Sequence, residues 1–173
     1  METTEFEPAD LAAQLPAVPT PLHPAILRET DSIPFVDLGD GSHMQLLHVD
    51  LSQGIWVVRM RFEPGCKIDK HYHTGPVFAF TVRGAWHYLE YPEQVNREGS
   101  YLFEPAGSVH TLAALPDGKE PAEVWFTVFG ANVNIDDNGN VINILDAATV
   151  LGVFRELCRQ YGYSSDNVIV AGL

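Results

Sequence analysis

The sequence predicts an all-β domain of the sandwich or barrel type, followed by one C-terminal helix. Between residues 33 and 144, short stretches of alternating apolar and polar residues recur at regular spacing, separated by glycine and proline. Asn138-Gly139, with apolar residues on both sides, is a strong signal for a two-residue hairpin turn. Many short strands with such punctuation are typical of an all-β sandwich or barrel.

The segment Ile55–Phe62 illustrates the alternation on which the strands are predicted. Trp56, Val58 and Met60 share one face of an extended chain, whereas Arg59 and Arg61 share the other. One face of the strand is therefore expected to be buried. Further strands are expected at Met44–Asp50, Val77–Val82, Ala85–Tyr91, Gly99–Glu104, His110–Ala114 and Glu123–Gly130.

The two ends of the chain differ from the middle. Residues 1–30 contain five prolines, which exclude a central strand or a long helix and predict an extended arm. Near the other end, Asp146 is a candidate N-cap, Leu145 and Val150 fit a hydrophobic staple, and Gly162 ends the helix. We expect a single domain, with an arm at 1–30, a barrel at 31–145, and a helix and tail at 146–173.

Length, charge and cysteine content exclude several classes of protein. The 173 residues suit one domain, and the net charge of −13 argues against binding of nucleic acid or an anionic membrane. Cys66 and Cys158 are too few and too far apart for a disulfide framework, which favours reduced thiols in a cytoplasmic protein. No apolar run reaches membrane-spanning length, and the acidic start is unlike a signal peptide.

Three of the seven histidines have the spacing of metal ligands. His71 and His73 are two residues apart, so in a strand both imidazoles face the same side and can chelate a divalent metal. Such a pair also occurs on surface strands without a metal, but His110 provides a third donor later in the chain. Four histidines lack ligand spacing and are interpreted as surface or core residues: His23, His43, His48 and His87.

The segments around these histidines resemble the two motifs of the cupin superfamily. In the first motif, Gly65 is followed after five residues by His71-Tyr-His73, and Gly84 closes it. The second motif reads Gly99, five residues, then Pro105-Ala-Gly107 and two residues before His110. The resemblance implies that the predicted barrel at 31–145 is a small double-stranded β-helix with a metal near its centre.

The sequence departs from the cupin pattern at Val77, the position that usually holds a glutamate ligand. A metal held here would have three neutral histidine ligands, more net positive charge and open positions for a chelating substrate and O2. Imidazoles accept Fe, Zn, Ni or Mn, so the ligands alone do not choose the metal. The alternative is a cupin that has lost its metal.

A narrower resemblance extends over three segments, 71–80, 84–91 and 103–111. They are similar to the small three-histidine dioxygenases that cleave C–C bonds of ketones, namely the 2,4′-dihydroxyacetophenone and, more distantly, the acetylacetone dioxygenases. The likeness implies non-haem Fe(II), an aryl α-hydroxyketone and O2 as substrates, and an aromatic carboxylate plus formate as products. The chemistry is plausible from first principles, because the ketone and hydroxyl oxygens can chelate one cation, which acidifies the substrate.

Two carboxylates are candidates for a supporting role. Glu104 lies six residues before His110, and acetylacetone dioxygenases also have a glutamate there. It is predicted to be catalytic, either orienting a ligating histidine or taking the substrate proton; the alternative is an ordinary rim residue. Glu90 is a candidate for an additional metal ligand or for a residue behind the ligands; alternatively it faces solvent.

The substrate pocket is expected to contain small and aromatic residues from several strands. The candidates are Trp56, Val77, Ala79, Trp86, Tyr88 and Trp125, although aromatic residues in such strands are more often plain core. If Val77 points to the metal, Phe78 and Phe80 lie on the outside of the barrel. Those exposed phenylalanines favour a homodimer or homotetramer.

Two other functions remain open at this stage. Zinc anti-sigma factors contain a cupin domain with a similar histidine motif, so a metal-binding sensor is the alternative function. The 30 residues before the barrel are too few for the separate sigma-binding domain of those proteins. A metal-free cupin of the sugar-isomerase type is a third class, which the three histidines disfavour.

Overall fold

The structure, a computed structural model, describes residues 24–172, and it confirms the all-β fold with one α-helix among them. Most of the predicted arm, residues 1–23, lies outside the described residues. The strands are β1 (Val36–Asp37), β2 (Ser42–Asp50), β3 (Ile55–Phe62), β4 (His71–His73), β5 (Val77–Arg83), β6 (Ala85–Tyr88), β7 (Asn96–Arg97), β8 (Tyr101–Glu104), β9 (Leu112–Ala114), β10 (Ala122–Phe129), β11 (Asn132–Ile135), β12 (Val141–Leu145) and β13 (Ile169–Ala171). A short 3-10 turn, η1 (Thr30–Ser32), precedes them, and the α-helix is α2 (Ala147–Tyr161).

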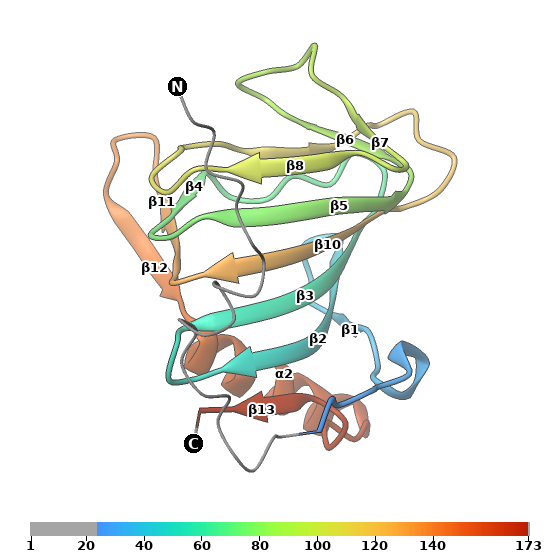
Figure 1. The fold of residues 1–173 in the computed structure, drawn as a ribbon. Helices are drawn as coiled ribbons and strands as arrows, with labels where there is room; N and C mark the ends of the chain where they lie inside the picture. The colour runs from blue at the N-terminus through green and yellow to red at the C-terminus, as the bar shows by residue number, and fades with distance from the viewer. Residues whose placement is uncertain (1–23, 173) are drawn as a thin grey trace, which may run out of the picture.

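The strands form one large sheet and two small ones. The large sheet has the order β1-β2-β3-β10-β5-β8, with β13 parallel to β2, and its long strands run across the front of Figure 1. The small sheets have the orders β12-β11-β4 and β7-β6-β9. Because β10 pairs with β3 on one side and β5 on the other, segments far apart in the sequence close the barrel.

Several predicted strands are shorter in the structure than in the sequence pattern. The strand expected from residue 99 begins at Tyr101, because Gly99 has a φ of 83° and belongs to a turn. The strand expected to reach Tyr91 ends at Tyr88, where the Tyr91 N–H donates to the Tyr88 carbonyl at 3.0 Å. The strand expected from His110 begins at Leu112.

The C-terminal helix begins and ends where its capping residues predict. The Asp146 carboxylate accepts a hydrogen bond from the Thr149 N–H at 2.7 Å, and Gly162 ends the helix with a φ of 72°. Phe154 and Cys158 on the apolar face are buried. The helix packs against β2 at one end of the barrel, as Figure 1 shows.

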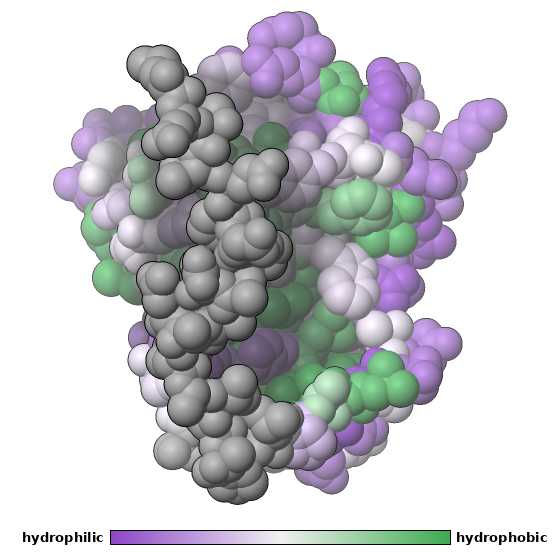
Figure 2. All heavy atoms as spheres, in the orientation of Figure 1, coloured by the Kyte–Doolittle hydropathy of each residue, from purple (hydrophilic) through white to green (hydrophobic). Residues whose placement is uncertain are grey.

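The outer face of the large sheet carries a buried ion-pair network and exposed aromatic residues. Glu123 on β10 is fully buried and pairs with Arg59, Arg61 and Arg83 of the two neighbouring strands. On the same sheet, the Phe80 side chain is 49% exposed, and Figure 2 shows hydrophobic residues on this face. Within residues 24–172, no helix has the length and apolar character needed to cross a bilayer.

Candidate metal centre

Three histidines converge at one end of the barrel interior. His71 and His73 lie on β4, where strand alternation turns both side chains inward. His110 forms an isolated bridge with His71, in which the two backbone N–H groups donate to the opposite carbonyls at 3.0 and 2.9 Å. One nitrogen from each ring lies within 4.8 Å of the other two, and all three side chains are buried.

Neighbouring groups fix the orientation of two of these rings. His71 Nδ1 lies 2.6 Å from the Asp69 carbonyl oxygen, so this nitrogen carries the proton and leaves Nε2 free to act as a donor. The Tyr88 ring stacks on the His110 ring with 4.2 Å between centroids. Both contacts are of the kind that holds metal-ligating imidazoles in place.

A buried carboxylate completes the cluster. Register between β5 and β8 places Glu104 directly opposite Val77, so the two side chains share the inner face of the sheet. Glu104 Oε2 lies 3.4 Å from His73 Nε2 and 3.3 Å from His110 Nε2. The Tyr88 hydroxyl donates a hydrogen bond to the other oxygen, Oε1. The carboxyl group that is absent at position 77 is thus supplied by Glu104 on the adjacent strand.

The electrostatics of the cluster match a cation site. Burial, together with the nearby His71, lowers the pKa of both His73 and His110 to about 3, so these imidazoles are neutral. Burial raises the pKa of Glu104 to about 7, although the hydrogen bond from Tyr88 opposes the rise. His110 Nε2 and Glu104 Oε2 are buried with no hydrogen-bond partner among the described residues.

These unpartnered atoms test whether a metal ion fits the residues. Neutral imidazole nitrogens and a carboxylate oxygen all present electron pairs, and a buried polar atom without a partner is costly. A divalent cation between them would satisfy all of these groups together. The three-histidine cluster could therefore hold a metal ion, and nitrogen donors of this type suit Fe, Zn, Ni or Mn.

A cavity of about 210 Å3 opens beside the histidines and lies between the two hydrophobic clusters of the core. Of the predicted pocket residues, Trp56 and Tyr88 line it. Its remaining walls are largely apolar, with Met44, Val58, Met60, Phe126, Val128, Leu145 and Val150 among the lining residues. Pockets for drug-sized ligands are usually larger, so this cavity suits a small molecule.

The structure corrects the other four predicted pocket residues. Trp125 points to the outer face of the sheet and is 36% exposed, because its neighbour Phe126 faces the cavity and alternation turns Trp125 away. Val77, Ala79 and Trp86 are buried as expected but do not line the cavity. Trp86 lies behind Tyr88, with 5.2 Å between ring centroids, where it supports the wall from outside.

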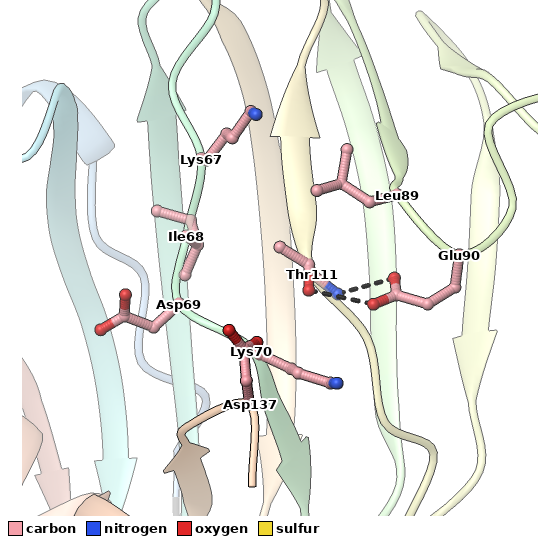
Figure 3. Close-up of a pocket in the computed structure, with 8 residues that line it drawn as sticks. All are labelled: Lys67, Ile68, Asp69, Lys70, Leu89, Glu90, Thr111 and Asp137. Atoms are coloured by element: carbon pink, nitrogen blue, oxygen red, sulfur yellow. Dashed lines mark hydrogen bonds between the residues drawn. The ribbon is translucent and has the colours of Figure 1, made fainter.

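Glu90 does not reach the histidine cluster. Figure 3 shows it in a surface pocket, where its carboxylate accepts hydrogen bonds from the Thr111 backbone N–H at 2.9 Å and the Thr111 hydroxyl at 3.0 Å. Because Thr111 follows His110 directly, this contact anchors the chain next to a candidate ligand. Glu90 is exposed and is therefore not a substitute metal ligand, in agreement with the alternative that it faces solvent.

Sequence reasoning missed Asn132 and Asn134, which also line the cavity. They occupy alternate positions of β11, which pairs with β4 so that Asn132 lies opposite His73 and Asn134 opposite His71. The available signal was the repeat Asn-Val-Asn, a polar alternation that matches His-Tyr-His. The asparagines and histidines form one wall of the cavity only because β11 pairs with β4.

Fold and site together define a cupin with a buried three-histidine centre. The chain belongs to the ChrR cupin-like domain family, whose model matches residues 23–131. No curated protein matches the chain significantly.

Comparison with solved structures gives the same fold. A protein of unknown function with a cupin-like fold from Ralstonia eutropha JMP134 is 33% identical, with a TM-score of 0.79 over 88% of this chain and 96% of that one. An acetylacetone dioxygenase from Acinetobacter johnsonii is 22% identical, with a TM-score of 0.67 over 83% of this chain and 98% of that one. The latter likeness establishes the fold alone.

We predict that His71→Ala, His73→Ala and His110→Ala each abolish metal retention, because two imidazoles cannot hold a divalent ion against dilution as three can. Metal content after loading and desalting, measured by inductively coupled plasma mass spectrometry, checks this. His87→Ala is the matched control, since His87 lies outside the cluster, and it should keep stoichiometric metal. Undiminished metal in all three site variants would show that the cluster is not the binding site.

Proposed function

We propose that this chain is a non-haem Fe(II) dioxygenase that cleaves an aryl α-hydroxyketone, such as 2,4′-dihydroxyacetophenone, into an aromatic carboxylate and formate. One observation carries the proposal: a buried carboxylate, Glu104, stands beside three neutral histidines at the wall of a small apolar cavity. The reaction balances, since the ketone and one O2 together contain all the atoms of the two acids.

The donor set supports a centre that binds substrate. Bound Fe(II) would supply a Lewis acid that acidifies a chelated α-hydroxyketone and a redox partner for O2. His71, His73 and His110 would hold it without adding charge. Three protein ligands leave open positions, as in other catalytic metal sites.

Glu104 is placed to handle the proton of the substrate hydroxyl. Its Oε2 faces the same point as the imidazole nitrogens and is free of hydrogen bonds within the described residues. The Tyr88 hydroxyl holds Oε1, which fixes the carboxylate plane and leaves Oε2 to accept the proton. Tyr88 also stacks on His110, so one residue positions both the base and a metal donor.

The cavity walls favour an aromatic or other apolar substrate. Trp56, Phe126 and Val128 cover the space next to the histidines with carbon. Excluding water strengthens the electrostatic contacts inside the site and protects reactive species from hydrolysis. The modest cavity volume also limits the substrate to a small ketone.

A metal-binding sensor is the second candidate, and the family match favours it. The matching model describes the cupin-like domain of ChrR. In a sensor, Glu104 would join the three histidines as a fourth ligand and close a tetrahedral zinc site. The two functions differ in metal identity, in open coordination positions and in reactivity with O2.

Oxygen consumption separates these functions. After anaerobic loading with Fe(II), we expect O2 uptake with hydroxyacetophenones and none without substrate. The panel also includes β-diketones such as acetylacetone, because acetylacetone dioxygenases are the more distant likeness. An oxygen electrode measures the rate, and chromatography identifies the acids. No uptake across the panel, together with stoichiometric zinc in the protein as purified, would reject the dioxygenase and favour the sensor.

We expect Glu104→Gln to retain metal and lose turnover. Glutamine preserves the shape of the side chain but cannot take a proton, and loss of a general base typically costs a factor of about 100 to 10,000 in rate. Metal analysis and O2 uptake on the same sample report the two properties separately. Glu98→Gln, at an exposed position, should behave like the unmodified protein. Full activity of Glu104→Gln would remove Glu104 from the mechanism.

A further inference from the structure

We propose that Asn132 and Asn134 form a hydroxyl-binding subsite in the cavity wall, which selects aryl ketones that carry a hydroxyl group on the ring. This inference rests on the proposed function, because it names what the same cavity recognises beyond the chelating atoms. Its basis is a row of three asparagine side chains that begins next to the histidines.

The position of the subsite follows from strand register. In the order β12-β11-β4, the middle strand places Asn132 opposite His73 and Asn134 opposite His71. Cross-strand partners point to the same face, so both amides face the cavity beside the candidate metal ligands. The two asparagines are each 8% exposed, and both line the cavity.

The amides are linked in a chain that leaves one end unused. Asn132 Nδ2 donates to Asn134 Oδ1 at 2.8 Å, and Asn134 Nδ2 donates to Asn143 Oδ1 at 2.8 Å. Asn143 is exposed on β12, so the chain runs from solvent into the cavity. Within residues 24–172, Asn132 Oδ1 accepts no hydrogen bond. The inner end of the chain therefore presents a fixed acceptor in a largely apolar space.

The amides and the histidines share one cavity wall, so a single aryl ketone can contact both. Asn132 is the cross-strand partner of His73, and both side chains line the cavity that Trp56 and Val128 also line. With the ketone at the histidines, the ring passes along Trp56 and Val128, and its hydroxyl donates to Asn132 Oδ1.

This arrangement gives the subsite its selectivity. Asn134 holds the Asn132 amide, so the acceptor is preorganised and loses little freedom when a ligand binds. A ligand without a hydroxyl would cover this acceptor and leave it unpaired. A phenolic ketone restores that hydrogen bond, whereas an unsubstituted or fluorinated one does not.

Calorimetric titration of the full-length protein loaded with redox-inert Zn(II) tests the subsite without turnover. The ligands are 2,4′-dihydroxyacetophenone and 4′-fluoro-2-hydroxyacetophenone, in which fluorine replaces the ring hydroxyl at similar size. We expect the hydroxyl compound to bind about tenfold more tightly to the unmodified protein, because one net hydrogen bond contributes about that factor in affinity. Asn132→Leu should abolish that preference, mainly by weakening the hydroxyl compound.

Asn138→Ala, in the exposed turn between β11 and β12, is the matched control and should keep the preference. If Asn132→Leu does not fold by circular dichroism, Asn132→Ala takes its place in the same titration and should likewise lose the preference. Equal affinity for both ketones, or no binding of either, would overturn the subsite. A preserved preference in a protein that shows no O2 uptake with Fe(II) would support the subsite and reject the dioxygenase.

Discussion

The site depends above all on the register of β4, a strand of only three residues. Side chains of a strand alternate between faces, so a slip of one residue would turn both histidines outward and bring Tyr72 into the cavity. Two neighbours prevent the slip: β11 pairs along one edge, and the bridge to His110 fixes the other. The same pairings that hold the strand also bring the third histidine and the two asparagines to it.

Burial of the donor groups explains why the three-histidine cluster could hold a cation. Three imidazoles and the Glu104 carboxylate lie in a space with few other polar contacts, and unpartnered buried groups of this kind are destabilising. Protein groups satisfy only some of these polar atoms: the Tyr88 hydroxyl donates a hydrogen bond to Glu104, and the Asp69 carbonyl pairs with His71 Nδ1. Such an arrangement destabilises an empty core and would be favourable around a metal ion, which the three-histidine cluster could hold.

The sequence predicts the fold and the histidine triad well, and the cavity less well. Alternation and turn residues are local signals, so strand β3 and helix α2 are read correctly from short segments. The three histidines are recognisable because their spacing is fixed by two motifs. By contrast, placing Glu104 opposite Val77, or Asn132 opposite His73, requires long-range pairing that no local pattern contains. Trp125 was misjudged for a related reason, because alternation defines two faces but does not say which one is inside.

Isotope labelling of the products tests the central claim most directly. The Fe(II)-loaded protein is given 2,4′-dihydroxyacetophenone under 18O2, and the two acids are examined by mass spectrometry. If Glu104 and the three histidines support a dioxygenase, one labelled oxygen enters the aromatic carboxylate and one enters formate. Cleavage with label in only one product, or with oxygen drawn from water, would contradict that account.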